Sequence, residues 1–219
     1  MSNLLVSTRD PELESIGYSD ALLAGLAPDG GLYTPLDYPE LSEEMLRGLE
    51  GKPYQEIFTS VKGMFVGDIP YSVQRDVASE AYSTDKFEVV DGNMVPVIEV
   101  ADEFSIQSLS LGPTAAFKDM ALQPVAQEMD YVLSKRGRGI VLLGATSGDT
   151  GSSAEAAFQG LGTAGVVMLS PEVGMSDFQK AQMGELTGGN IANISIKDNF
   201  DACQALVKAL KRNSEFSGL

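Results

Sequence analysis

The sequence of 219 residues has no histidine, no tryptophan and a single cysteine, Cys203. Without histidine, neither a Ser-His-Asp nor a Cys-His catalytic arrangement can form, and a histidine-based zinc site is excluded. We predict no metal site. One cysteine cannot form an internal disulfide, which is typical of proteins in a reducing cytoplasm. We expect Cys203 to pack on an amphipathic helix and not to act as a nucleophile.

Positive charge is also scarce, since 31 acidic residues outnumber 15 basic ones and give a net charge of −16. This balance argues against partners such as nucleic acid or an anionic membrane surface. A small anionic substrate would have to be held by local lysines, arginines and backbone amides. The start of the chain lacks a secretory pattern, and no apolar run has membrane-spanning length, so we expect no membrane partner and a cytoplasmic location.

The pattern of apolar residues divides the chain into a helical region, 1–90, and a region of alternating strands and helices, 91–219. In the first region we expect a helix from residue 18 with Ser19 or Asp20 as its cap, and an extended piece at 32–35. Further helices are expected from residue 42, from Pro53 and over 71–82. The role predicted for this region is packing against the main sheet.

The second region predicts an α/β fold, a parallel sheet covered by helices on both faces, because strands and helices alternate along it. The expected strands are 95–100, 104–109, 139–143, 165–169 and 191–196. The expected helices are 118–134, 152–159, 176–183 and 199–212. Pro124 should bend the first of these helices unless it lies in the first turn.

Lys118 is the first candidate for chemistry. Apolar residues surround it in sequence, and desolvation of an amine favours the neutral form that attacks a carbonyl. Asp119 could hold the charge on the lysine and oppose this effect. The alternative is a solvated surface lysine at a helix start.

The second candidate is the glycine-rich loop GATSGDTG, residues 144–151, which follows an apolar strand and opens a helix. Backbone N–H groups in such a loop bind an anion, and the hydroxyls of Thr146, Ser147 and Thr150 add donors. The loop is neither a Walker A motif nor a dinucleotide fingerprint, because it lacks the lysine of the former and the G-x-G-x-x-G of the latter. A tight turn with a hydroxyl cap is the alternative.

Taken together with other segments, these two motifs resemble the threonine synthase family. The matching segments are STR at 7–9, GLAPDGGLYTP at 25–35, GPTAAFKD at 112–119, the loop at 144–151, QKAQM at 179–183 and, more weakly, FDACQ at 200–204. The resemblance implies a pyridoxal-phosphate enzyme of the tryptophan-synthase-β type, also called fold type II. Its implied reaction converts O-phosphohomoserine and water to threonine and phosphate by γ-elimination and β-addition.

The resemblance also implies roles for individual residues. Lys118 would carry the pyridoxal 5′-phosphate cofactor as a Schiff base and act as acid and base, with Phe117 beside the ring. Asp149 stands where the wider fold often has asparagine and would lie near the cofactor's 3-hydroxyl. The substrate carboxylate would be bound by the loop residues Thr146, Ser147, Gly148, Asp149 and Thr150.

Some family features remain open or are absent. Arg9 and Asp29 belong to matching segments, and either ligand contact or turn structure explains them. Leu111 replaces a histidine that many members have, so no role for that histidine transfers. Members continue past Leu219 with the loop for the cofactor phosphate, and a plain turn explains Gly188-Gly189-Asn190 better than a second such loop.

We therefore expect a truncated chain that binds the cofactor weakly and has no appreciable synthase activity alone. Two other functions stay open. One is a lyase of the same fold that yields an α-keto acid, and the other is a non-catalytic scaffold that serves assembly.

Overall fold

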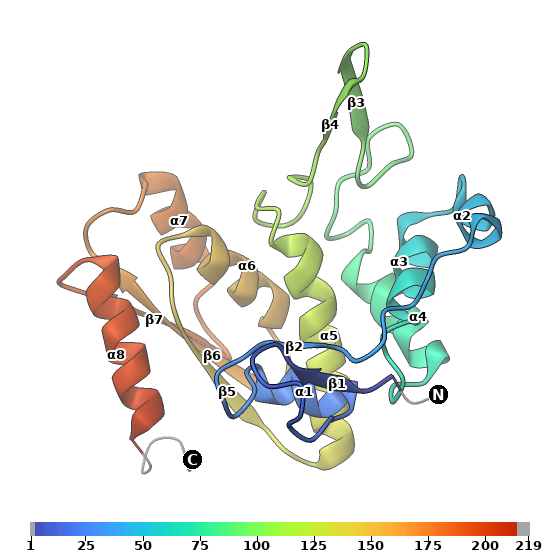
Figure 1. Cartoon of the computed structure of the whole chain (residues 1–219). Coiled ribbons are helices and arrows are strands. Elements are labelled where there is room, and N and C mark those ends of the chain that lie inside the picture. Colours follow the sequence, from blue (N-terminus) through green and yellow to red (C-terminus); the bar gives the residue numbers. More distant parts are fainter. Residues whose placement is uncertain (1–2, 214–219) are drawn as a thin grey trace. The chain divides into compact units, whose positions relative to one another are not determined.

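The computed structural model describes residues 3–213, and the chain divides into two compact units (Figure 1). The first unit comprises Met1–Thr84 and Val90–Met94, and the second comprises Asp85–Val89 and Val95–Leu219. Within the described residues, no helix is both long and apolar enough to cross a membrane.

Helices predominate in the first part of the chain, and strands and helices alternate from Ile140 onward. The helices are α1 (Tyr18–Ala24), α2 (Glu43–Leu49), α3 (Tyr54–Lys62), α4 (Tyr71–Ala81), α5 (Asp119–Arg136), α6 (Asp149–Phe158), α7 (Asp177–Glu185) and α8 (Phe200–Arg212). The strands are β1 (Leu5–Ser7), β2 (Tyr33–Pro35), β3 (Val97–Ala101), β4 (Phe104–Gln107), β5 (Ile140–Ala145), β6 (Ala164–Pro171) and β7 (Ile191–Ile196).

The first unit combines a two-stranded sheet with helices. Strands β1 and β2 pair antiparallel, and β1 was not among the predicted strands because three residues are too few for an alternating pattern to show. Helices α3 and α4 pack together through aromatic rings. The ring of Tyr82 lies 4.9 Å from that of Tyr54 and 5.0 Å from that of Phe58, both edge to face.

One predicted helix cap and one predicted helix start in the first unit are wrong. Helix α1 begins at Tyr18, as predicted, but neither Ser19 nor Asp20 caps it. The carboxylate of Asp68 instead accepts the Ser19 N–H at 2.9 Å, so the cap comes from a residue distant in sequence. Pro53 is the N-cap of α3 and not its first helical residue.

The second unit contains the predicted parallel sheet, with strand order β5-β6-β7. The central strand β6 is the most buried of the three. Helix α6 packs on β6, while α8 packs on β5 and β6, and Figure 1 shows these two helices on opposite sides of the strands. The predicted α/β class is therefore confirmed.

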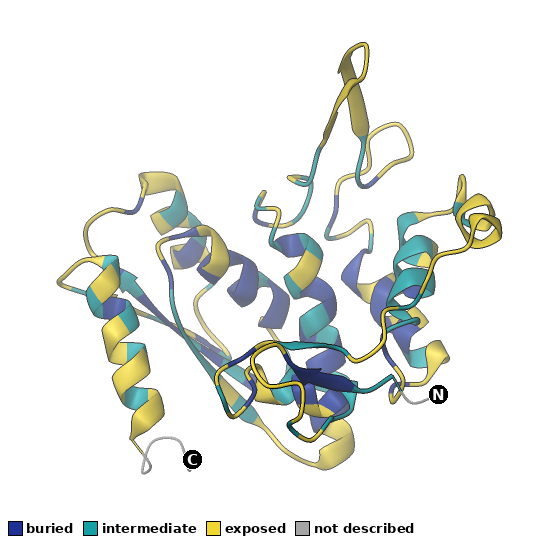
Figure 2. Ribbon diagram, in the orientation of Figure 1, coloured by how far each residue is buried: buried dark blue, intermediate teal, exposed yellow. Residues whose placement is uncertain are grey.

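The two strands expected at 95–100 and 104–109 do not join this sheet. They form a separate antiparallel hairpin, β3 and β4, because a connection of two residues cannot carry a chain back to a parallel position. Every residue of both strands is exposed (Figure 2). The exposed side chains include the apolar residues Val97, Ile98, Val100, Phe104 and Ile106.

Helices α5 and α6 pack against each other in the core of the second unit. Many residues of both helices are buried (Figure 2). Helix α5 continues through Pro124, which is buried within it. Helix α6 begins three residues before the predicted start, since the loop residues Asp149, Thr150 and Gly151 already have helical conformation. Burial raises the pKa of the Cys203 thiol in α8, as suits a core residue.

Glu155 of α6 is a buried acid with an unusual environment. It is 0% exposed, and burial raises the pKa of its carboxyl to about 7, against a small opposing effect from Asn193. The Asn193 side chain donates to one carboxyl oxygen at 3.3 Å, and the other oxygen has no partner among the described residues. A protonated carboxyl suits this site because the neutral form loses less hydration on burial.

The Glu155→Gln variant should therefore change how stability depends on pH. The folded protein keeps a proton on Glu155 up to pH of about 7, whereas the unfolded chain releases it near pH 4.5. Unfolding then releases a proton between these values, so this group's contribution falls as pH rises, by at most about 1.4 kcal/mol per unit. Urea unfolding at pH 5, 6, 7 and 8 would show a flatter curve for the variant.

The matched control is Glu99→Gln in the exposed strand β3, which should leave the shape of the pH curve unchanged. If Glu155→Gln and the unmodified protein lose stability in parallel as pH rises, the buried carboxyl is not the cause.

Candidate functional site

A tight turn at residues 112–118 places the candidate lysine at the start of α5. The buried Asp119 closes this turn, because its two carboxyl oxygens accept from the Thr114 N–H at 2.8 Å and the Thr114 hydroxyl at 2.7 Å. Asp119 is thus committed to Thr114. The predicted possibility that it holds the charge of Lys118 has no support in the geometry.

The backbone of this lysine turn is close-packed and strained. A Cβ on Gly112 would lie 2.6 Å from Asp119 and 2.9 Å from Phe87, so only glycine fits there. Ala115 has a φ of 56°, a conformation that costs a residue with a side chain on the order of 1 kcal/mol or more. Strain of this kind persists only where the surroundings impose the conformation.

Lys118 itself is half-buried and lies over an aromatic ring. Its Nζ is 4.4 Å from the centre of the Phe117 ring, which is 60% exposed. Within residues 3–213, no carboxylate lies within ion-pairing distance of this nitrogen. The amine is therefore available for chemistry in a way that a paired surface lysine is not.

The glycine-rich loop is held by one buried hydroxyl, that of Thr146, which is 2% exposed. This hydroxyl accepts from the N–H groups of Gly148 at 3.0 Å and Gly151 at 2.8 Å, and donates to the Gly148 carbonyl at 3.1 Å. Its one donor and two acceptor positions are all used. Thr146 therefore shapes the loop, and its hydroxyl has no capacity left for a ligand in this conformation.

Other N–H groups of the loop remain open. In the described part of the chain, the N–H groups of Ser147, Asp149 and Thr150 have no acceptor, and all three are exposed residues at the start of α6. Unpaired N–H groups at a helix N-terminus attract anions, and the helix dipole adds to the attraction. The loop can therefore bind a carboxylate.

Gly148 allows another element to approach the loop closely. It has a φ of 144°, and a Cβ on it would overlap the side chain of Gln179. Gln179 belongs to α7, and its Nε2 donates to Asp149 at 2.9 Å. Its Oε1 accepts from Ser176 in a capping box at the start of α7.

The lysine turn and the glycine-rich loop meet through Thr114. The Thr114 hydroxyl lies 2.9 Å from the hydroxyl of Ser153 in α6, and since its single proton points to Asp119, Ser153 donates to it. The Thr114 carbonyl accepts from Gln182 Nε2 at 2.9 Å. The segment carrying Lys118 and the helix opened by the loop are thus joined directly and also by way of α7.

Four residues of this arrangement were not predicted as site residues, namely Thr114, Ser153, Gln179 and Gln182. The S-x-x-Q pattern at Ser176 and Gln179 indicates a capping box and could have located the start of α7. No pattern in the sequence indicates that Gln179 and Gln182 reach residues 30 and 68 positions away.

The remaining candidates lie elsewhere. In the first unit the Asp29 carboxylate accepts from the Ser7 hydroxyl and the Gly31 N–H, and the Arg9 guanidinium donates to the Asp29 carbonyl. The Gly31 N–H and the Ser7 hydroxyl lower the pKa of Asp29, so turn structure accounts for both charged residues. At the Gly188-Gly189-Asn190 segment, Gly188 pairs with Ile191 in a turn. At the position where many family members have histidine, the backbone carbonyl of Leu111 accepts from the Glu88 N–H.

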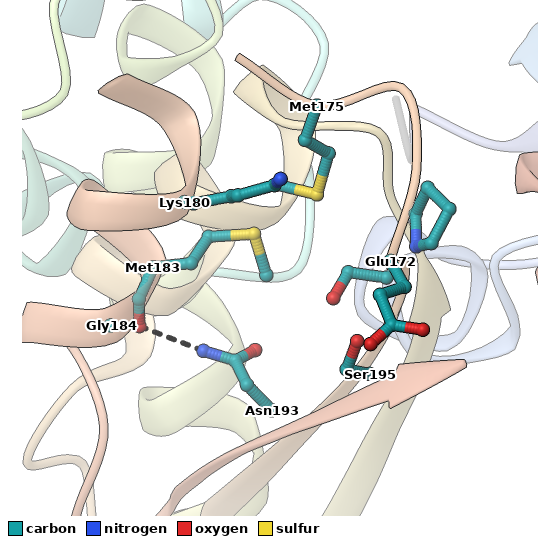
Figure 3. Close-up of a pocket in the computed structure, with 9 residues that line it drawn as sticks. Glu172, Met175, Lys180, Met183, Gly184, Asn193 and Ser195 are labelled. Atoms are coloured by element: carbon teal, nitrogen blue, oxygen red, sulfur yellow. Dashed lines mark hydrogen bonds between the residues drawn. The ribbon is translucent and has the colours of Figure 1, made fainter. Parts of the chain in front are cut away.

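A cavity of about 300 Å³ lies between α7 and the carboxyl ends of β6 and β7 (Figure 3). Met175, Met183 and Lys180 line it from the helix side, and Asn193 and Ser195 line it from β7. Asn193 also donates to the Met183 carbonyl at 2.8 Å, which ties α7 to the sheet at the cavity's edge.

Comparison with known proteins gives consistent results. Residues 5–82 match the family model described as Threonine synthase N terminus. A threonine synthase from Corynebacterium glutamicum is 45% identical over 215 residues, which cover 96% of this chain and 44% of that protein. The structure of a PLP-bound threonine synthase from Brucella melitensis matches with a TM-score of 0.89 and 42% identity, over 98% of this chain and 46% of that one. A threonine synthase from yeast matches with a TM-score of 0.90 and 30% identity, over 98% of this chain and 44% of that one.

The fold and the site define an α/β chain in which a lysine turn and a glycine-rich loop with open backbone N–H groups are joined. The chain is similar to threonine synthases over nearly all of its own length and matches the model of their N terminus at residues 5–82, so the resemblance predicted from its motifs is confirmed. It spans between 44% and 46% of the length of these relatives.

The Gly148→Ala variant should disrupt the loop. Alanine at this φ is strained and its methyl group would overlap Gln179, so we expect the second unit to lose about 2 kcal/mol of stability. Chemical denaturation followed by circular dichroism measures this loss. Gly162→Ala is the control, because among residues 3–213 no atom of a non-neighbouring residue lies within 4 Å of the position that its methyl group would take, and it should change stability by less than about 0.5 kcal/mol. Equal effects of the two variants would contradict the described packing of Gln179 on Gly148.

Proposed function

We propose that this chain supplies the cofactor-binding lysine and the carboxylate-binding loop of a threonine synthase. Such an enzyme converts O-phosphohomoserine and water to threonine and phosphate with pyridoxal 5′-phosphate as cofactor. The observation that carries the proposal is the joining of the lysine turn to α6 through Thr114, which gives an amine and an anion site within one unit. Similarity to threonine synthases over 96% of the chain supports the specific reaction.

The residues present fit the cofactor. Lys118 has a half-buried amine without a carboxylate partner in the described part of the chain, as an amine that binds an aldehyde requires. Phe117 offers an exposed ring face beside that amine, suited to packing near a pyridine ring. When bound, pyridoxal phosphate supplies an electron-withdrawing ring that stabilises carbanions next to the substrate's amino group.

Each residue then has a defined task. Lys118 Nζ would hold the cofactor's aldehyde, and as a free amine it would accept and return protons at the substrate's Cα and Cβ. The open N–H groups of Ser147, Asp149 and Thr150 bind the substrate carboxylate, together with the hydroxyls of Ser147 and Thr150. Thr146 and Gly148 give the loop its shape. Asp149 is the residue assigned to the cofactor's 3-hydroxyl.

The partners proposed for the site are small molecules, and the location proposed for the protein is the cytoplasm. The net charge of −16 supports the absence of nucleic acid as a partner. The single cysteine, buried and free in α8, supports a reducing compartment.

Covalent trapping tests the proposal directly. Pyridoxal 5′-phosphate mixed with the chain should give an absorbance band at the edge of the visible range, and borohydride should fix the cofactor on Lys118, as peptide mapping by mass spectrometry would show. Lys118→Arg keeps the charge but removes the reactive amine, and it should abolish the adduct on this peptide. Lys197→Arg, at an exposed position after β7, is the matched control and should leave trapping unchanged.

An adduct spread evenly over the surface lysines, unchanged by Lys118→Arg, would contradict the proposal and favour a non-catalytic scaffold. The reaction product distinguishes a threonine synthase from the lyase that yields an α-keto acid. In any preparation that releases phosphate from O-phosphohomoserine, we expect threonine, whereas 2-oxobutyrate would show that the α-keto acid pathway operates.

A further inference from the structure

Helix α7 has little apolar contact to hold it in place. Met183 is the only buried residue of this helix, and its side chain lines the cavity of about 300 Å³ between α7 and the sheet (Figure 3). Three directional contacts at 2.8–2.9 Å position the helix instead: Gln179 to Asp149, Gln182 to the Thr114 carbonyl, and Asn193 to the Met183 carbonyl. The third contact attaches α7 to the sheet, and the first two attach it to the candidate site.

The two glutamines reach different parts of that site. Gln179 contacts the first residue of α6, beside the open N–H groups of the loop. Gln182 contacts the residue whose own N–H and hydroxyl hold Asp119, next to Lys118. One helix therefore bonds to both functional segments, from side chains spaced three residues apart on the same face.

We propose that Gln179 and Gln182 are positioning residues that set the carboxylate-binding loop and the lysine turn relative to each other. In this arrangement Gln179 orients Asp149 and restricts the loop around Gly148. Gln182 fixes the peptide of Thr114 and thereby the entry to α5. This inference rests on the proposed function for its chemical meaning, but its structural content can be tested without it.

The conservative variant of Gln179 separates this role from helix capping. The Oε1 of Gln179 accepts from Ser176 in the capping box, while its Nε2 donates to Asp149. Gln179→Glu keeps an acceptor of the same length for Ser176 and loses only the donor, and it adds repulsion toward the Asp149 carboxylate. Gln179→Ala removes both contacts.

Hydrogen exchange of backbone amides is the first measurement. Gln179→Glu and Gln179→Ala should both raise the exchange rate of the hydrogen-bonded amides of Gly148 and Gly151 by about fivefold, the size expected for one hydrogen bond, with little change at the amides of Thr114 and Ala115. Gln182→Glu, which also loses its donor, should raise exchange at Thr114 and Ala115 instead. Gln159→Ala replaces an exposed glutamine at the end of α6 and should leave both segments unchanged.

The second measurement is the rate of borohydride trapping of pyridoxal 5′-phosphate on Lys118. Gln182→Glu should slow trapping by about fivefold, whereas Gln179→Glu should leave it within about twofold of the unmodified chain. A loss of overall stability alone would raise amide exchange in both segments and slow trapping in both variants. Different effects of the Gln179 and Gln182 variants therefore identify a positioning role.

The inference is wrong if Gln179→Glu exchanges like the unmodified chain, since Gln179 would then act only through the helix cap. It is also wrong if both glutamine variants behave like Gln159→Ala. If the unmodified chain shows no trapping, the proposed function fails, while the exchange measurements still decide whether α7 positions the two segments.

Discussion

The second unit depends on the hydrogen bonds of one buried threonine. Thr114 uses its N–H and hydroxyl to hold Asp119, accepts a hydrogen bond from the Ser153 hydroxyl, and offers its carbonyl to Gln182. The start of α5, the body of α6 and helix α7 therefore meet at a residue that is 5% exposed. Because an unmet buried polar group costs more than a typical hydrogen bond contributes, the loss of one of these contacts would leave a buried partner at a cost in stability. Their closure is what places an amine and a set of free backbone donors within one structural unit.

The backbone around Thr114 and the glycine-rich loop is also constrained. Gly112, Gly148 and Gly151 each lie where a methyl group would overlap a neighbouring side chain, and Ala115 adopts a left-handed conformation. A glycine loses more conformational entropy on folding than other residues, and a left-handed alanine is strained in the folded state. Both occur where segments of the chain must approach closely. The buried Glu155 is part of the same helix that carries the loop, and it holds an oxygen without a partner in the described residues. Both the loop that opens α6 and the turn before α5 thus have a constrained backbone.

Much of the fold, and the two segments that form the candidate site, could be predicted from the sequence. The parallel sheet and most helices follow from apolar periodicity, and the lysine turn and glycine-rich loop follow from their residue types. What could not be predicted depends on contacts between distant residues. The cap of α1 comes from Asp68, the strands at 95–107 pair with each other because their turn is short, and Gln179 and Gln182 reach across the fold. The roles assigned to Lys118, Phe117 and the loop residues, and the boundary between regions at residue 90, remain predictions.

The exposed hairpin of β3 and β4 has a consequence for how copies of the chain behave near one another. Its two strands carry five apolar side chains and two unpaired edges in the described part of the chain, a combination that ordinarily invites strands of other molecules to add on. Three acidic residues, Glu99, Asp102 and Glu103, sit at or near its tip, and the chain as a whole carries a charge of −16. Charges of the same sign repel one another at low ionic strength, and dissolved salt weakens that repulsion. The acidity of the sequence therefore opposes the addition of a second copy at this hairpin, an opposition that we expect salt to reduce.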